Sequence, residues 1–249
     1  MIKDNLILHC GAHHASYDDV LNVQTPNRTH SHVPVPHSEV LSLVGAEMTR
    51  LGFNLKDAAH GLSHEGNRYF GLLSYSRPAG PCGDRDDYET IVGVRNSHDK
   101  SVSAGLVLGS QVFVCDNLSF MGEIKISRKH TAHVEGALPQ LVREAVAKAP
   151  GALEVQDRRF DTYKDFGLSR GQANDLMVRS FERGACTASQ LGQVIKEYRD
   201  PRHPEFRDRN AWSLFNAFTE VGKSNSLAVA PERTMALQAT FDHAISFSA

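Results

Sequence analysis

The residues best suited to chemistry lie in a short cluster, Asn96-Ser97-His98-Asp99-Lys100-Ser101, between two apolar runs. His98 could act as a general base or a metal ligand, Asp99 could orient it, and Lys100 could bind a phosphate or stabilise an anion. Ser97, His98 and Asp99 are consecutive, so their side chains cannot easily converge into a Ser–His–Asp triad. Asn, Ser and Asp are also good turn formers, because their side chains bond back to the local backbone. The cluster is therefore either a catalytic site, with His98, Asp99 and Lys100 as candidates, or a well-bonded turn.

A second set of polar and basic residues follows the cluster. Asn117 closes the polar segment Cys115-Asp116-Asn117, and Arg128-Lys129-His130-Thr131 precedes a predicted helix. Free backbone N–H groups and the helix dipole favour an anion at a helix N-terminus, so this arrangement is typical of a phosphate site. The alternative is a solvated basic turn. The candidate phosphate or nucleic-acid contacts are Asn96, Lys100, Asn117, Lys125, Arg128, Lys129 and His130.

Histidine is unusually concentrated, with eleven of the thirteen before residue 134. A metal site could draw on Cys10 and several of these histidines, but neither the HExxH spacing nor a paired CxxC motif is present. We therefore assign no metal ligand. The cofactor is left unknown, and a divalent metal enters only with an enzymatic alternative. The chain also lacks a glycine-rich phosphate loop, which disfavours an NTPase of the Walker type.

Composition places the chain among soluble globular proteins. Its 249 residues are 41% hydrophobic and 22% charged, which is ordinary for a folded soluble protein. A net charge of −2 argues against coating DNA through overall charge, although a local basic strip remains compatible with nucleic-acid binding. No apolar run approaches the roughly 18–20 residues of a membrane span. Without a recognisable secretion signal or CxxC pair, we expect a cytoplasmic protein of a bacterial host cell with no membrane partner.

Apolar periodicity and turn signals predict a helix packed on a mainly antiparallel sheet in the first half. Strands that are adjacent in sequence and joined by short polar turns favour hairpins over parallel crossovers. The expected helices run from Ser16 to Val23 and from Ser38, as N-cap, to Leu51, with a proline-bearing loop between them. The expected strands cover 5–10, 53–63, 68–76, 88–95, 104–115 and 122–127.

The second half is predicted to be helical. Trp212, Phe215 and Phe218 recur at helical spacing, and such a stripe is more often core than a stacking platform for bases. Pro139 should kink or break the first helix, and 149–151 should separate it from the next. The expected helices cover 131–148, 153–166, 169–183, 187–199, 211–221 and 231–241.

These elements predict an α+β fold. Residues 1–130 should form a mainly antiparallel sheet with a packed helix, and residues 131–249 should form a helical region packed on it. No linker is flexible enough to separate independent domains, so one continuous globular unit is expected.

Several motifs together resemble a known family. They are LHCGA at 8–12, VPHSEVL at 35–41, GNRYFG at 66–71, NSHDKS at 96–101, VFVCDNLSF at 112–120, RKHT at 128–131 and SLFNAFTEV at 213–221. This combination resembles the phage/plasmid-like family called domain of unknown function 932, in the branch that includes uncharacterised enterobacterial prophage proteins. The resemblance spans nearly the whole chain. It implies a role in the DNA metabolism of mobile elements or in conflict with host defences, and it assigns no catalytic residue.

Three functions are compatible with these observations. The leading one is a nucleic-acid-binding accessory protein of a mobile element, for single-strand binding or annealing, in which Lys100, Lys125, Arg128 and Lys129 contact phosphates. The second is an enzyme acting on nucleic acid or a nucleotide, using His98 and Asp99 with Lys100 or His130. The third is an inhibitor that binds a protein of a host defence complex. The partner is then nucleic acid, preferably single-stranded, or a host protein, and a homo-oligomer is compatible with all three.

Overall fold

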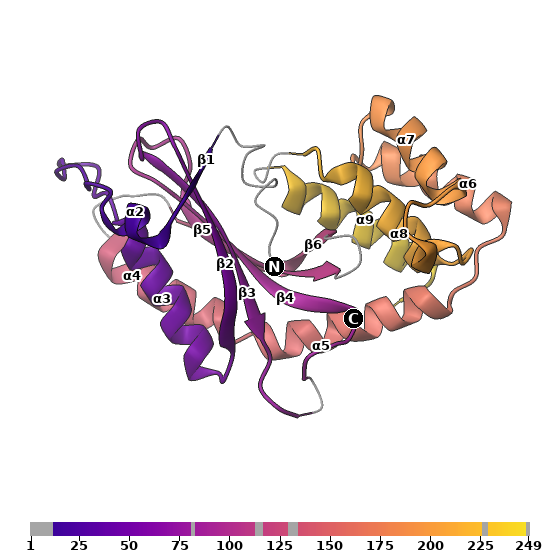
Figure 1. Cartoon of the computed structure of the whole chain (residues 1–249), viewed down its shortest axis with the longest axis horizontal. Helices are drawn as coiled ribbons and strands as arrows, with labels where there is room; N and C mark the ends of the chain where they lie inside the picture. Colours follow the sequence, from indigo (N-terminus) through magenta and orange to yellow (C-terminus); the bar gives the residue numbers. More distant parts are fainter. Residues whose placement is uncertain (1–11, 81–82, 113–116, 129–133, 226–228, 248–249) are drawn as a thin grey trace.

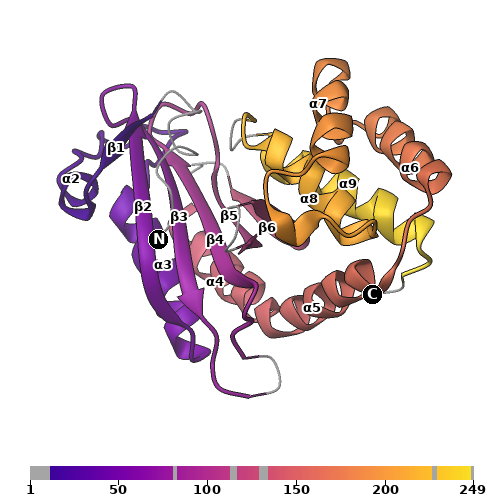
Figure 2. The same cartoon turned by 45° about the vertical axis from the view of Figure 1, so that its right-hand side comes forward.

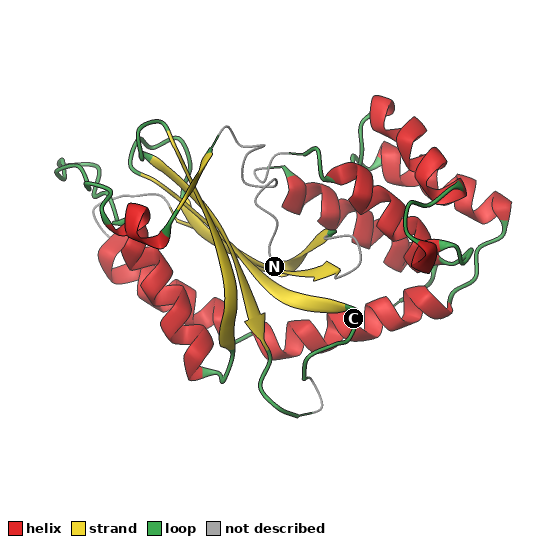
Figure 3. Ribbon diagram, in the orientation of Figure 1, coloured by secondary structure: helices red, strands yellow, loops and turns green. Residues whose placement is uncertain are grey.

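The computed structural model describes residues 12–80, 83–112, 117–128, 134–225 and 229–247, with the backbone alone for 122–128 and 135 (Figure 1). Within these residues, six antiparallel strands form one sheet in which every strand pairs with its neighbours in sequence. The strands are β1 (His13–Ala15), β2 (Asn54–Ser63), β3 (Arg68–Ser76), β4 (Tyr88–Ser97), β5 (Ala104–Val112) and β6 (Leu118–Arg128). The predicted α+β class and antiparallel sheet are confirmed (Figure 3).

Helices α3 (His37–Arg50) and α4 (Val134–Val146) cover one face of this sheet (Figure 1). The apolar residues of α3 recur at the spacing of a helix face, and Val44 and Met48 are almost fully buried there. They pack with Val92 and Val94 of β4 in the first hydrophobic core. The short helix α2 (Tyr17–Leu21) precedes α3 in the chain.

The long helix α5 (Ala149–Asp165) runs from the sheet to a bundle of helices (Figure 2). The bundle contains α6 (Arg170–Glu182), α7 (Ala188–Arg199), a 3₁₀ turn (Pro204–Phe206), α8 (Ala211–Gly222) and α9 (Ala230–Ala244). Phe160 of α5 lies 4.7 Å from Trp212 and 5.9 Å from Phe215, measured between ring centroids. The stripe predicted to be core is therefore core, because Trp212, Phe215 and Phe218 are all buried in this second cluster.

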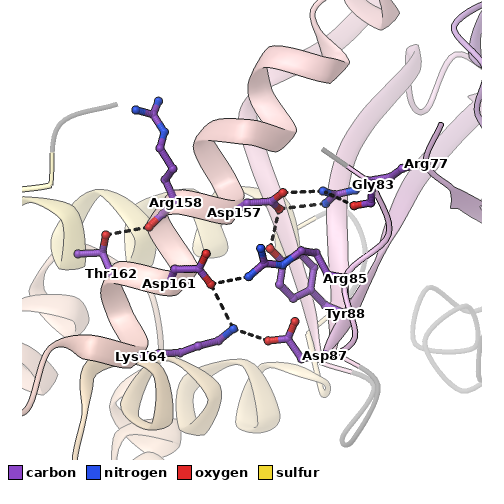
Figure 4. A network of polar contacts seen from close by, with 10 residues as sticks. All are labelled: Arg77, Gly83, Arg85, Asp87, Tyr88, Asp157, Arg158, Asp161, Thr162 and Lys164. Carbon is purple, nitrogen blue, oxygen red and sulfur yellow. Dashed lines mark hydrogen bonds and ion pairs between the residues drawn. The ribbon is translucent and has the colours of Figure 1, made fainter. Parts of the chain in front are cut away.

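A polar network joins the end of β3 and the start of β4 to α5 (Figure 4). The Arg77 guanidinium, with 2% of its side chain exposed, donates to both carboxylate oxygens of Asp157, at 2.7 and 3.1 Å. The Tyr88 hydroxyl donates to the same carboxylate at 2.6 Å. One turn further along α5, Asp161 accepts a hydrogen bond from Arg85 at 2.5 Å. These bonds and the aromatic cluster fix α5 against the sheet.

Local signals in the sequence locate several helix starts correctly. Ser16, Ser169 and Thr187 each accept a hydrogen bond from a first-turn N–H and each belongs to a capping box. Ser38 was the wrong N-cap, since α3 begins at His37 and Pro36 precedes it without a side-chain cap. The predicted strand over 5–10 lies outside the described residues.

Pro139 and Pro150 both lie inside helices and break neither, while the alternative prediction of a kink at Pro139 stays a prediction. Residues 149–151 do not interrupt the helices but form the first turn of α5, where proline is tolerated because its missing N–H would have no partner. Pro139 lies inside α4, which is continuous from Val134 to Val146. Strand β6 begins at Leu118, four residues before its predicted start. Strand β5 is described to Val112, and residues 113–115 of the predicted strand lie outside the described residues.

Candidate nucleic-acid interface

The first half of the polar cluster is buried at the end of β4. The side chains of Asn96 and His98 both donate to the carbonyl oxygen of Val35, at 2.8 and 3.0 Å. His37 Nε2 donates to the Gly66 carbonyl at 2.8 Å, so its Nδ1 is the acceptor for Asn96, at 2.9 Å. These bonds fasten the loop before α3 to the sheet and to the turn between β2 and β3.

The imidazoles of His37 and His98 stack with their centroids 4.0 Å apart and their planes within 2°. His32 Nε2 donates to the His98 carbonyl at 3.0 Å, which adds a third histidine to the same junction. Nδ1 of His98 is buried and has no hydrogen-bond partner, and burial lowers the pKa of this imidazole. With 4% of its surface exposed, His98 is a neutral structural residue at this junction.

The second half of the cluster is a turn. Asp99 accepts hydrogen bonds from the Ser101 N–H at 2.9 Å and from Arg68 Nε at 2.7 Å. Burial alone would raise the pKa of Asp99, but the bonds from Ser101 and the ion pair with Arg68 outweigh it and hold that pKa below its usual range. Lys100 is exposed and adopts a positive φ of 66°. No hydrogen bond joins Asp99 to His98, so the pair is not arranged for general base catalysis.

Burial of His98 and His60 makes the stability of the fold depend on pH. Burial lowers the pKa of both imidazoles below the ordinary value of about 6.5. The unfolded chain therefore binds more protons below about pH 6.5, so this stability is fully present above that pH and is lost as the pH falls. We expect the free energy of unfolding, measured in urea, to decrease between about pH 7 and about pH 5, above the range of ordinary carboxylates.

The contribution of His98 can be separated from that of other histidines. A His98→Asn variant should show a shallower decrease with falling pH, whereas His30→Gln, which changes an exposed histidine, should follow the wild type. Identical pH dependence in the three proteins would contradict this assignment.

Asn117 lies at the opposite end of β6 from Arg128, and its buried side chain is bonded to the helical bundle. Its side-chain amide donates to the backbone carbonyl of Asn216 in α8 at 3.1 Å and to the Asn216 side-chain oxygen at 3.2 Å. Its carbonyl accepts from Val112 at 3.0 Å. At 1% exposure, Asn117 links the sheet to the helical bundle and does not present a contact to nucleic acid.

The predicted basic residues near the end of β6 occupy different register positions. Lys125 is the strand partner of Val107, and Arg128 is the partner of Ala104. Val107 and Ala104 belong to hydrophobic clusters on opposite faces of the sheet, so positions 125 and 128 fall on opposite faces as well. Lys129 and His130 lie outside the described residues.

The sheet face opposite α3 and α4 carries a charged side chain in a central strand. Arg95 alternates with Val94, which faces the first core, and is the strand partner of Phe70 on one side and Gly105 on the other. Phe70 in turn pairs with Gly61 of β2. We call these four residues the Arg95 surface. Position 125 lies on the same face of the sheet as Arg95, in the next row of strand partners on that face, where it pairs with Val107.

Arg95 is partly buried and makes no hydrogen bond or ion pair within the described part of the chain. The nearest acidic side chain on its own strand is Glu89, six residues or about 20 Å away and hydrogen-bonded to Ser74. The sequence prediction did not include Arg95. The signal that could have found it is an arginine that directly follows the apolar centre of a predicted strand, residues 91–94.

The described residues contain neither a cluster of metal ligands nor a membrane-spanning helix. Among the residues described, no group of three or more His, Cys, Asp or Glu side chains is arranged to hold a metal ion. No helix in the same part of the chain is long and apolar enough to cross a lipid bilayer.

Comparison with curated proteins and with solved structures gave no match. A family model does match, over residues 27–240, and thus includes α3, strands β2 to β6 and most of the helical bundle. The chain therefore belongs to the family described as a domain of unknown function, DUF932.

Proposed function

We propose that this protein binds nucleic acid, with a preference for single strands, as an accessory protein of a phage, plasmid or prophage. The observation that carries the proposal is Arg95, a guanidinium in a central strand with no carboxylate partner among the described residues. An unpaired, partly buried arginine is costly unless an anion completes its environment. A backbone phosphate supplies such an anion and is matched by the planar fork of the guanidinium.

The neighbours of Arg95 in its row across the sheet are small or apolar, and Gly61, Phe70 and Gly105 are buried while Arg95 is partly exposed. Gly61 and Gly105 flank Phe70 and Arg95 in this row, which continues to His14 of β1 and to position 127 of β6. Glycine in a strand often marks a close approach by a ligand or another backbone. Lys100 in the adjoining turn is exposed and without a partner in the described part of the chain. The flexible backbone of a single nucleic-acid strand can contact this single row of strand partners more easily than the rigid surface of a duplex can.

Because the net charge of the protein is −2, we expect only a few of its cationic side chains to contact phosphates. The expected phosphate contacts are Arg95, Lys100 and Lys125, with Arg68 as a fourth through the guanidinium donors that its ion pair with Asp99 leaves unused. With three or four contacts, the logarithm of the affinity should fall with the logarithm of the salt concentration, with a slope of roughly −2 to −3. This modest slope distinguishes the proposal from a protein that binds DNA through its overall charge.

Replacing Arg95 by glutamine tests the proposal directly. We expect affinity for a fluorescent single-stranded oligonucleotide, measured by anisotropy, to weaken about tenfold because one charge-assisted contact is lost. The salt slope should become shallower by about 0.7. The control is Arg170→Gln, which removes the same charge from the exposed first residue of α6. Equal affinities for the two variants would remove the support for the Arg95 surface.

The near-neutral charge also favours a second candidate, an inhibitor that binds a protein of a host defence system. That function predicts no affinity for DNA or RNA at low salt and the specific recovery of one host protein in a pull-down. The two candidates therefore give opposite results in the same anisotropy titration.

A further inference from the structure

An open groove of about 740 Å³ lies between the C-terminal half of α7 and the C-terminal end of α8. Its lining includes the cationic side chains of Lys196, Arg202 and Lys223 and the exposed acidic side chain of Asp200. Two carboxylates, Glu197 and Glu220, lie at its base with 10% and 7% of their side chains exposed. Arg202, by contrast, has 71% of its side chain exposed. The acids are therefore inside the wall of the groove and the arginine faces its opening.

The buried carboxylates hold the cations in place. Glu197 accepts the backbone N–H of Arg202 at 3.0 Å and pairs with its Nε at 3.2 Å. Glu220 accepts from Arg202 Nη1 at 3.0 Å with one oxygen and from Lys223 Nζ at 2.6 Å with the other. Both carboxylate oxygens of Glu197 and of Glu220 thus have a cationic or N–H partner, whereas the carboxylate of Asp200 is exposed.

The cations keep donors that none of these bonds uses. A guanidinium has five N–H groups, of which Glu197 and Glu220 engage two, and an ammonium has three, of which Glu220 engages one. The remaining donors belong to two residues that line the groove and that are each held by at least one carboxylate. Fixed cationic donors backed by carboxylates are suited to a multiply charged anion, because little rotamer freedom is lost on binding.

We infer that this groove binds phosphate groups, with the Arg202 guanidinium donating hydrogen bonds to the phosphate and the Lys223 ammonium group as a second cationic contact. The inference goes beyond the proposed function and does not depend on it. The phosphate could belong to a free nucleotide or polyphosphate, or to the backbone of a nucleic acid, and the chemistry of the contacts is the same. Glu220 is then a positioning residue, since it acts only through the two cations.

The test is calorimetric titration of the full chain with sodium tripolyphosphate. We expect Arg202→Gln to weaken binding at least tenfold, whereas Arg170→Gln should leave it unchanged. Glu220→Gln should also weaken binding, although it makes the net charge of the protein more positive by one. A surface that attracts phosphate by charge alone would bind more tightly after that change.

Three results would overturn the inference: no binding by the wild type, unchanged affinity in Arg202→Gln, or tighter binding by Glu220→Gln. Because Glu220 is buried, thermal unfolding checks that its variant is folded, and Lys223→Gln repeats the test at a side chain that is 32% exposed. Unchanged affinity in Lys223→Gln would show that Lys223 does not contact the phosphate.

A parallel titration with a single-stranded oligonucleotide identifies the source of the phosphate. Weaker oligonucleotide binding in Arg202→Gln assigns the groove to backbone phosphates, and no change assigns it to a free phosphate compound. If the oligonucleotide does not bind but tripolyphosphate binding depends on Arg202, the inference stands and the proposed function fails.

Discussion

Replacing Asp157 by alanine should lower the free energy of unfolding by about 3–5 kcal/mol. The substitution leaves the Arg77 guanidinium, with 2% of its side chain exposed, without its bidentate partner. It also removes the acceptor of the Tyr88 hydroxyl. An uncompensated buried charge costs much more than the loss of an exposed ion pair, because water cannot replace the missing carboxylate. Urea denaturation followed by circular dichroism measures the change.

The matched control is Asp161→Ala, one turn along the same helix (Figure 4). Asp161 also pairs with an arginine, but 48% of its side chain is exposed, so the change should cost less than about 1 kcal/mol. Equal losses in the two variants would show that the burial of Arg77 does not set the strength of the network.

Replacing Phe160 by alanine should destabilise the protein by a similar amount, about 3–5 kcal/mol. Phe160 has no exposed surface and contacts the rings of Tyr88, Trp212 and Phe215. Its removal leaves a cavity between α5, the sheet and α8, and four aromatic rings, that of Tyr163 included, lose a partner. The midpoint of urea unfolding should fall while the slope of the transition is unchanged.

Phe181→Ala provides the comparison at the surface. Phe181 of α6 is 37% exposed, so its truncation should change the stability by roughly 0.5 kcal/mol. A small effect of Phe160→Ala, close to that of Phe181→Ala, would mean that the aromatic cluster does not bind α5 to its neighbours.

Elements with local signals could be predicted from the sequence. The start of α6 depends on Ser169 and Gln172, three residues apart, and the β2–β3 turn depends on residues that tolerate positive φ. Where remote contacts decide, the prediction was wrong. His37, the first residue of α3, is bonded through its ring to Gly66 and Asn96, which are distant in sequence, and no nearby residue indicates these contacts.

The candidate site shows the same division. The composition of the 96–101 cluster suggests both a turn and a catalytic site, and only the contacts with Val35 and Arg68 assign His98 and Asp99 structural roles. Arg95 was missed because its significance comes from strand pairing with Phe70 and Gly105. Neither the contacts of His98 and Asp99 nor the strand pairing of Arg95 can be recognised in a linear sequence motif.

The most direct test of the central claim is an anisotropy titration of the wild-type chain with single- and double-stranded oligonucleotides of one sequence, at about 50 and about 200 mM salt. We predict tighter binding to the single strand and a loss of affinity of roughly 20- to 50-fold between the two salt concentrations, as three or four phosphate contacts require. No binding to either oligonucleotide at the lower salt concentration, or an affinity that does not depend on salt, would contradict the claim.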